Sequence, residues 1–128
     1  MEYGICHLGV IPMRKENSHK SEMISQLLYG DCYKIIEKRK GWNKIRLDWD
    51  GYEGWIDSNQ TFEVSKDNFA NITETNIKIS TDLVNYITTK DESLFPILIG
   101  SDLRGLDLLG HHFEGEFNQP KKLKKKLA

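Results

Sequence analysis

Two cysteines and four histidines are the side chains of this 128-residue sequence that could act as a nucleophile or its base. Cys6 directly precedes His7, but neighbouring side chains on a strand point to opposite faces, so these two cannot form a thiolate–imidazole pair with each other. Cys32 lies between Asp31 and Tyr33, with no histidine beside it. We therefore expect no catalytic residue in this chain.

The same side chains do not predict a metal site. Cys6, Cys32, His111 and His112 follow no zinc-binding spacing, and the two adjacent histidines would diverge on a strand. We expect neither a metal nor a cofactor. Both cysteines fall in strand-like runs, which favours two buried, reduced thiols over a disulfide.

Aromatic residues are the stronger candidates for function. Six of them lie within residues 29–55: Tyr29, Tyr33, Trp42, Trp49, Tyr52 and Trp55. Such rings provide a large, rigid contact area at low entropic cost, and they also fill the cores of small β-proteins. We expect Tyr33 and Tyr52 in the core. For the tryptophans two alternatives stay equally open, a core position or a position at the surface or between domains.

The predicted ligand-binding residues combine aromatic and charged side chains: Trp42, Trp49, Trp55, Tyr29, Arg14 and Glu16. The two charged residues belong to residues 14–21, a polar stretch typical of a long exposed loop, where they could contact a peptide terminus. Asp48 and Asp50 are more typical of a turn than of an acid–base couple.

The tryptophans belong to a predicted β-hairpin. Two strand-like runs, residues 41–47 and 51–57, flank an acidic turn that ends in Asp50-Gly51, and an Asp-Gly step between such runs is a strong hairpin signal. Alternation places Trp42 and Trp55 on one face of the hairpin. The opposite, more aliphatic face is expected to hold Ile45, Leu47, Tyr52 and Ile56.

Further strand-like runs precede and follow this hairpin. In residues 3–60 they cover 4–12, where Pro12 should end the pairing, then 23–28 and 32–37. Residues 61–75 are expected to form a short helical or irregular connection, with a helix start near Ser65. A second β-rich zone follows, with runs at residues 76–80, 83–88, 94–99 and 112–117. It is small for an independent core, so we expect it to pack on the first zone or on a following domain.

Charge and hydropathy exclude several classes of protein. The net charge is −1, but five of the 18 basic residues lie within residues 121–126, so the rest of the chain is acidic and does not predict nucleic-acid binding. The lysines follow Pro120 and favour a helix start, with a functional basic tail as the alternative. The sequence predicts no membrane span. Without a secretory signal we expect a cytoplasmic location, or an extracytoplasmic or cell-wall one if the N-terminus has been trimmed.

Four segments in order carry a resemblance to a known family: residues 13–18, 26–31, 41–46 and 54–57. With their arginine-containing loop, Leu-Tyr-Gly turn and two Gly-Trp strands, they resemble the bacterial SH3-like (SH3b) domain. The resemblance implies an all-β fold, with a small SH3-like barrel at residues 1–62 and a second, partial SH3-like segment at residues 63–118. Residues 119–128 would then be the start of a linker or helix.

The second β-rich zone resembles a narrower group of proteins. Residues 82–84, 96–101 and 113–115 are similar to the second SH3-like segment of NlpC-type cysteine peptidases, in which a catalytic domain follows. The resemblance implies that this chain is the non-catalytic recognition region of a murein-peptide (γ-D-glutamyl) endopeptidase. Its partners would be a murein peptide or peptidoglycan fragment and its own C-terminal catalytic domain. Neither Cys6 nor Cys32 lies in the Asp-Cys-Ser-Gly setting of that family's nucleophile.

A different class of protein also fits the aromatic cluster. The chain could be a stand-alone SH3-like module that binds an extended peptide or a partner protein through an aromatic groove. This alternative needs no catalytic domain.

Overall fold

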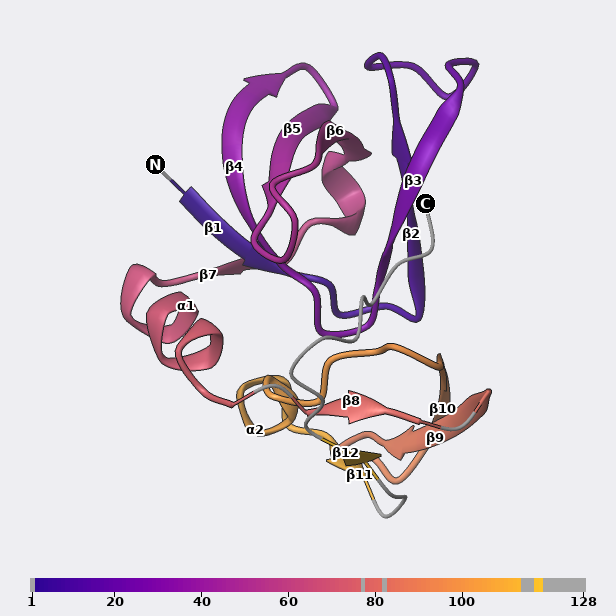
Figure 1. The fold of residues 1–128 in the computed structure, drawn as a ribbon. Helices are drawn as coiled ribbons and strands as arrows, with labels where there is room; N and C mark the ends of the chain where they lie inside the picture. The colour runs from indigo at the N-terminus through magenta and orange to yellow at the C-terminus, as the bar shows by residue number, and fades with distance from the viewer. Residues whose placement is uncertain (1, 77, 82, 114–116, 119–128) are drawn as a thin grey trace.

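The computed structural model describes residues 2–76, 78–81, 83–113 and 117–118 of the chain, and its architecture is all-β (Figure 1). Seven strands form the first sheet, in the spatial order β3-β2-β6-β5-β4-β1-β7. Their bounds are β1 Glu2–Ile5, β2 Val10–Arg14, β3 Met23–Leu28, β4 Cys32–Arg39, β5 Trp42–Leu47, β6 Glu53–Asp57 and β7 Glu63–Val64. All neighbouring pairs are antiparallel.

This first sheet bends around a single core, which we call the barrel core. The β2–β3 hairpin stands across from β4, β5 and β6, so that inward-facing side chains from both halves meet (Figure 1). Its buried members are Cys6, Ile11, Met13, Leu27, Tyr33, Ile35, Ile45, Leu47 and Ile56. The predicted aliphatic face of the hairpin is thus confirmed for Ile45, Leu47 and Ile56. Tyr52 lies outside the strand and is 43% exposed, so the prediction of a core position was wrong for this residue.

The predicted strand at residues 4–12 is two strands, β1 and β2, and Pro12 lies inside the second one. Pro12 pairs with Gln26 of β3, whereas β2 meets β6 only at Arg14, opposite Trp55. A proline is tolerated in a strand where its nitrogen faces no partner strand, and most of β2 has a partner on one side only.

A short helix covers one end of the first sheet. The α1 helix (Lys66–Thr73) begins after Ser65, whose hydroxyl oxygen accepts the Asn68 N–H at 3.1 Å, and this confirms the predicted helix start. Phe69 and Ile72 are its buried residues, and they pack on Ile5 and Cys32. The helix therefore completes the hydrophobic contacts of β1 and β4 that the barrel core does not reach.

The second β-rich zone forms a compact unit beside the first sheet (Figure 1). Strands β10 (Leu94–Leu98), β9 (Val84–Thr88) and β11 (His112–Phe113) make a three-stranded sheet, and β12 (Phe117–Asn118) pairs with β8 (Ile79–Ser80). A one-turn helix, α2 (Leu106–Leu109), follows β10. The final strand predicted at residues 112–117 is therefore divided between two sheets. The helix start predicted for residues 119–128 lies outside the described residues.

A buried contact joins this unit to the turn between β3 and β4. Tyr29 is fully buried and packs with Ile87, Ile97 and Leu103 of the second unit. The carbonyl oxygen of Tyr29 also accepts the Asp102 N–H at 2.8 Å. The second zone thus packs on the first, which is one of the two arrangements expected from its size.

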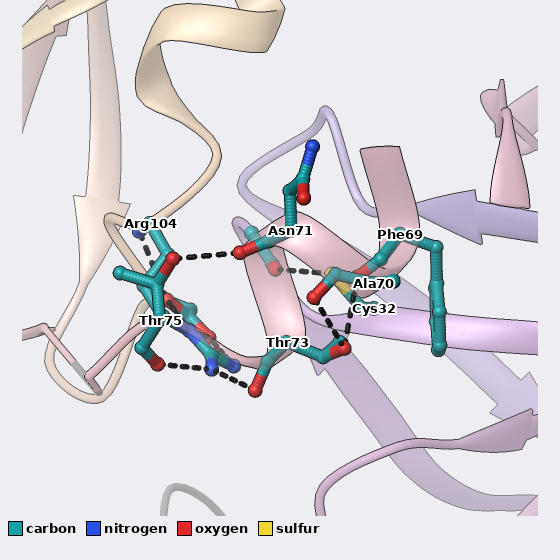
Figure 2. A network of polar contacts seen from close by, with 9 residues as sticks. Cys32, Phe69, Ala70, Asn71, Thr73, Thr75 and Arg104 are labelled. Atoms are coloured by element: carbon teal, nitrogen blue, oxygen red, sulfur yellow. Dashed lines mark hydrogen bonds and ion pairs between the residues drawn. The ribbon is translucent and has the colours of Figure 1, made fainter. Parts of the chain in front are cut away.

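Hydrogen bonds from Arg104 connect the second unit to the end of α1 (Figure 2). Arg104 donates through Nη2 to Oδ2 of Asp102 at 2.7 Å, and through Nη1 to the carbonyl oxygens of Thr73 and Thr75, each at 3.1 Å. The side chains of the ion pair are 5% and 0% exposed. Arg104 therefore satisfies carbonyl groups at the C-terminal end of α1 that have no partner within the helix.

Candidate functional site

A hollow lies where the loop end of the β2–β3 hairpin meets the open ends of β5 and β6. Its volume is about 120 Å³, and its lining combines a tryptophan, both signs of charge and a histidine: Pro12, Arg14, His19, Trp42, Asp57 and Gln60. Pockets that enclose a whole small ligand usually measure about 300–1,000 Å³, so this hollow fits one side chain or one peptide terminus.

The hairpin register places Trp42 beside Asp57. These two residues are direct cross-strand partners, at the start of β5 and the end of β6. Asp57 is also the N-cap of the short 3-10 helix η1 (Ser58–Gln60), and its Oδ1 accepts the Asn59 N–H at 2.9 Å. This hydrogen bond fixes the carboxylate and leaves Oδ2 directed toward the hollow, where it meets His19.

His19 covers the hollow through contacts with Asp57 and Trp42. Its Nε2 lies 3.3 Å from Oδ2 of Asp57, and its ring centroid lies 4.7 Å from that of Trp42. The side chain of His19 is nevertheless 70% exposed, because it stands at the tip of the loop between β2 and β3. A ligand could therefore reach the Trp42 ring by displacing one exposed imidazole.

Arg14 supports this loop and faces the hollow. Its Nη1 donates to the carbonyl oxygen of Ser21 at 3.0 Å, and Arg14 is one of the residues that line the hollow. Trp55 is its cross-strand partner on β6, with Lys44 of β5 on the other side. Trp55 is on the same face as Trp42, as predicted, but it is only 8% exposed. It underlies the site and offers little surface of its own.

The other predicted binding residues lie away from the hollow. Glu16 is exposed in the loop, where its N–H bonds to Ser21 Oγ at 2.8 Å. Trp49 is half-buried in the turn between β5 and β6. Tyr29 is fully buried in the contact with the second unit, so its ring has no surface to offer a ligand in this conformation. The structure thus brings together Arg14, Trp42 and Trp55.

Two lining residues with functional chemistry were not singled out from the sequence. Asp57 could have been found, because the hairpin register alone pairs it with Trp42. His19 could not, because its position depends on the path of an eight-residue loop that has no periodic pattern.

The hollow has the chemistry of recognition. Its six lining residues include a histidine–carboxylate pair but no cysteine, serine or threonine that such a pair could activate. The two thiols lie elsewhere and are buried, and the Cys6 Sγ donates to the carbonyl oxygen of Leu8 at 3.1 Å. Within the described part of the chain, no three histidine, cysteine or acidic side chains converge as metal ligands would.

The predicted turn role of Asp50 is confirmed, since its Oδ1 accepts the Tyr52 N–H at 2.9 Å. Tyr33 lies in the core as predicted, where burial raises the pKa of its hydroxyl, and that oxygen accepts the Phe62 N–H at 3.3 Å. None of the helices in the described ranges has the length and apolar character needed to cross a membrane.

Residues 13–60 match the family model of the bacterial dipeptidyl-peptidase SH3 domain. The match extends from the end of β2 to η1 and so includes five of the six residues that line the hollow. No curated protein sequence matches the chain. Residues 13–60 are therefore similar to a bacterial SH3-like domain.

Proposed function

We propose that this chain is the recognition region of a murein-peptide (γ-D-glutamyl) cysteine endopeptidase of the NlpC type. It positions a peptidoglycan-derived peptide beside a catalytic domain that follows it in the parent protein. The observation that carries the proposal is the hollow between Arg14, Trp42 and Asp57, within a region similar to the SH3 domain of bacterial dipeptidyl peptidases.

The charges of the hollow fit the end of such a peptide. Asp57 supplies a fixed carboxylate for a free amino group, and Arg14 supplies a guanidinium for a peptide carboxylate. Trp42 offers its ring face to a small apolar side chain such as that of alanine. The volume of about 120 Å³ suits this one residue and leaves the rest of the peptide to another surface.

Binding by this chain alone is expected to be weak. With only one terminal residue enclosed, a peptide that begins L-Ala-γ-D-Glu should bind with a Kd on the order of 0.1–1 mM. Isothermal titration calorimetry, or the shift of the Trp42 indole N–H signal in NMR, measures this affinity. Submicromolar binding would contradict the division of the site between two domains.

Three variants test the site. Trp42→Ala and Arg14→Gln should each weaken binding about tenfold or more, which corresponds to the loss of one ring contact or one charge-assisted hydrogen bond. Arg46→Gln is the matched control, because Arg46 lies on the same sheet but pairs with Glu53 at 2.8 Å outside the hollow. Equal losses of affinity in Arg14→Gln and Arg46→Gln would show a general charge effect and would reject the hollow as the binding site.

The same titrations separate the proposal from a stand-alone peptide-binding module. An acetylated peptide without a free amino group should lose its affinity if Asp57 binds that amine. If proline-rich peptides bind more tightly than the murein peptide, the endopeptidase assignment fails.

A further inference from the structure

The buried joint between the first sheet and the second unit contains a tyrosine and two histidines. Tyr29 lies in the β3–β4 turn and His7 in the β1–β2 connection. His111 directly precedes β11. The Tyr29 hydroxyl lies 2.7 Å from Nδ1 of His111, and the two ring centroids are 5.7 Å apart. Phe95 of β10 stacks on His111 with ring centroids 6.2 Å apart, and its ring also lies 6.0 Å from that of Tyr29. This group is distinct from the hollow at Trp42.

The hydrogen bond between Tyr29 and His111 favours a neutral imidazole. Burial raises the pKa of the Tyr29 hydroxyl, and the nearby Cys6 adds to this effect, so the hydroxyl keeps its proton. Among the described residues, Nδ1 of His111 is the hydrogen-bond partner within reach of this proton, so the hydroxyl donates to it. Nδ1 of His111 then accepts, and the ring carries its own proton on Nε2. A second proton would occupy Nδ1, so the Tyr29 oxygen would have to accept and its own proton would lose the acceptor that it has among the described residues.

The surroundings also oppose a positive charge. Burial lowers the pKa of His111, and repulsion from His7 and from Lys90 in the β9–β10 loop lowers it further. Burial alone lowers the pKa of His7, whose buried Nδ1 meets no hydrogen-bond partner among the described residues. The His7 ring packs at a tilt against that of Phe62, an uncharged neighbour, with centroids 5.3 Å apart.

Carboxylates on the neighbouring elements do not offset this repulsion. Asp31, in the same turn as Tyr29, uses Oδ2 to accept the Leu28 N–H at 2.8 Å. Asp107 in α2 is exposed, and His112 is exposed on β11 beside His111. The pKa of His111 is therefore lowered by burial and by two groups that can carry a positive charge, His7 and Lys90.

We propose that this joint is a proton-operated switch, in which protonation of His111 and His7 loosens the second unit from the first sheet in a mildly acidic medium. Both histidines have a lower pKa in the folded chain than their ordinary value of 6.5, so the unfolded or opened chain takes up protons first. The contribution of the two neutral histidines to the stability of the joint is complete above pH 6.5. It is lost progressively as the pH falls through 6.5 toward the lowered pKa of the folded state.

Hydrogen exchange measured by NMR on the full chain tests the proposal. The Asp102 amide is the reporter, because it donates to the Tyr29 carbonyl across the joint at 2.8 Å. The Leu47 amide, which donates to Tyr52 at 2.9 Å within the first sheet, is the internal control. Between pH 7.5 and 5.5, and after correction for intrinsic exchange, protection of Asp102 should fall about tenfold for each unit of pKa depression. Protection of Leu47 should change much less.

Two substitutions assign the effect to the half-buried His111. His111→Gln keeps an acceptor for Tyr29 but cannot be charged, so the pH-dependent loss at Asp102 should largely disappear. His112→Gln is the matched control on the exposed neighbour and should behave like the unmodified chain. Equal pH dependence in both variants would overturn the proposal. If His111→Gln does not fold, the imidazole signals of the unmodified chain decide, because a titration midpoint for His111 at or above 6.5 also overturns it.

Discussion

Two glycines with the same backbone conformation show how differently one added carbon can act. Gly30 has φ +84°, and a Cβ atom there would lie 1.8 Å from the carbonyl oxygen of Asp102. Gly51 has φ +74°, but a Cβ atom there would meet nothing within 4 Å. The first glycine allows the second unit to approach the β3–β4 turn, and the second only shapes a hairpin turn.

Gly30→Ala should therefore be far more damaging than Gly51→Ala. We expect Gly51→Ala to lower the free energy of unfolding by about 1–2 kcal/mol, the usual cost of a left-handed conformation with a side chain. Gly30→Ala adds a backbone clash and should cost more than about 4 kcal/mol. Urea denaturation followed by tryptophan fluorescence measures both, and similar costs would show that Asp102 does not approach Gly30 in solution.

The buried ion pair of Arg104 gives a second prediction for a single residue. Arg104→Met should cost about 3–5 kcal/mol, because it leaves the Asp102 carboxylate buried without its cation and frees the carbonyl groups of Thr73 and Thr75. Arg46→Met removes an exposed pair with Glu53 and should cost less than about 1 kcal/mol. Thermal unfolding by calorimetry compares the two, and equal melting temperatures would contradict a structural role for Arg104.

Strand β10 carries two aliphatic residues that differ strongly in burial, so it shows that a hydrophobic side chain is not always a core side chain. Ile97 is fully buried against Tyr29, whereas Leu94 on the same strand is 71% exposed. Ile97→Ala should cost about 2–5 kcal/mol through lost packing and a cavity. Leu94→Ala should stay within about 0.5 kcal/mol of the unmodified chain. Chemical denaturation of both variants checks this, and a large loss in Leu94→Ala would reveal a contact that covers the strand in solution.

Local patterns were sufficient to predict the elements that depend on neighbouring residues. The hairpin with Asp50-Gly51, the helix start at Ser65 and the strand at 23–28 all follow from turn, capping and alternation signals that act within a few residues. Pro12 was misread, because its tolerance inside β2 depends on which side of that strand has a partner. That information belongs to the sheet, and a single segment does not contain it.

The site was predictable only in part for the same reason. Trp42, Trp55 and Arg14 share the first sheet, so strand alternation and loop position pointed to them. Tyr29 was interpreted as a possible surface ring because its partners lie more than 50 residues away, at Ile87 and Ile97. Long-range packing of this kind leaves no periodic signal near the residue itself.

For the whole molecule, the arrangement of cores predicts where the chain can be divided. The barrel core is completed within residues 6–56, but the β1 and β4 residues Ile5 and Cys32 need α1 to cover them. The Tyr3 ring also packs at a tilt against Phe69 of α1, with ring centroids 4.5 Å apart. A fragment of residues 1–76 keeps these contacts, whereas residues 1–64 lose the whole helix.

Residues 1–76 should therefore fold alone, although with a lower stability than the full chain because Tyr29 becomes exposed. Residues 1–64 should be less stable than residues 1–76 by about 3 kcal/mol or more, since Phe69 and Ile72 each contribute about 1.5–3 kcal/mol when buried. Urea denaturation and the dispersion of amide signals in NMR compare the fragments. Equal stability of the two fragments would mean that α1 belongs to the second unit, and the boundary between the units would then move to residue 64.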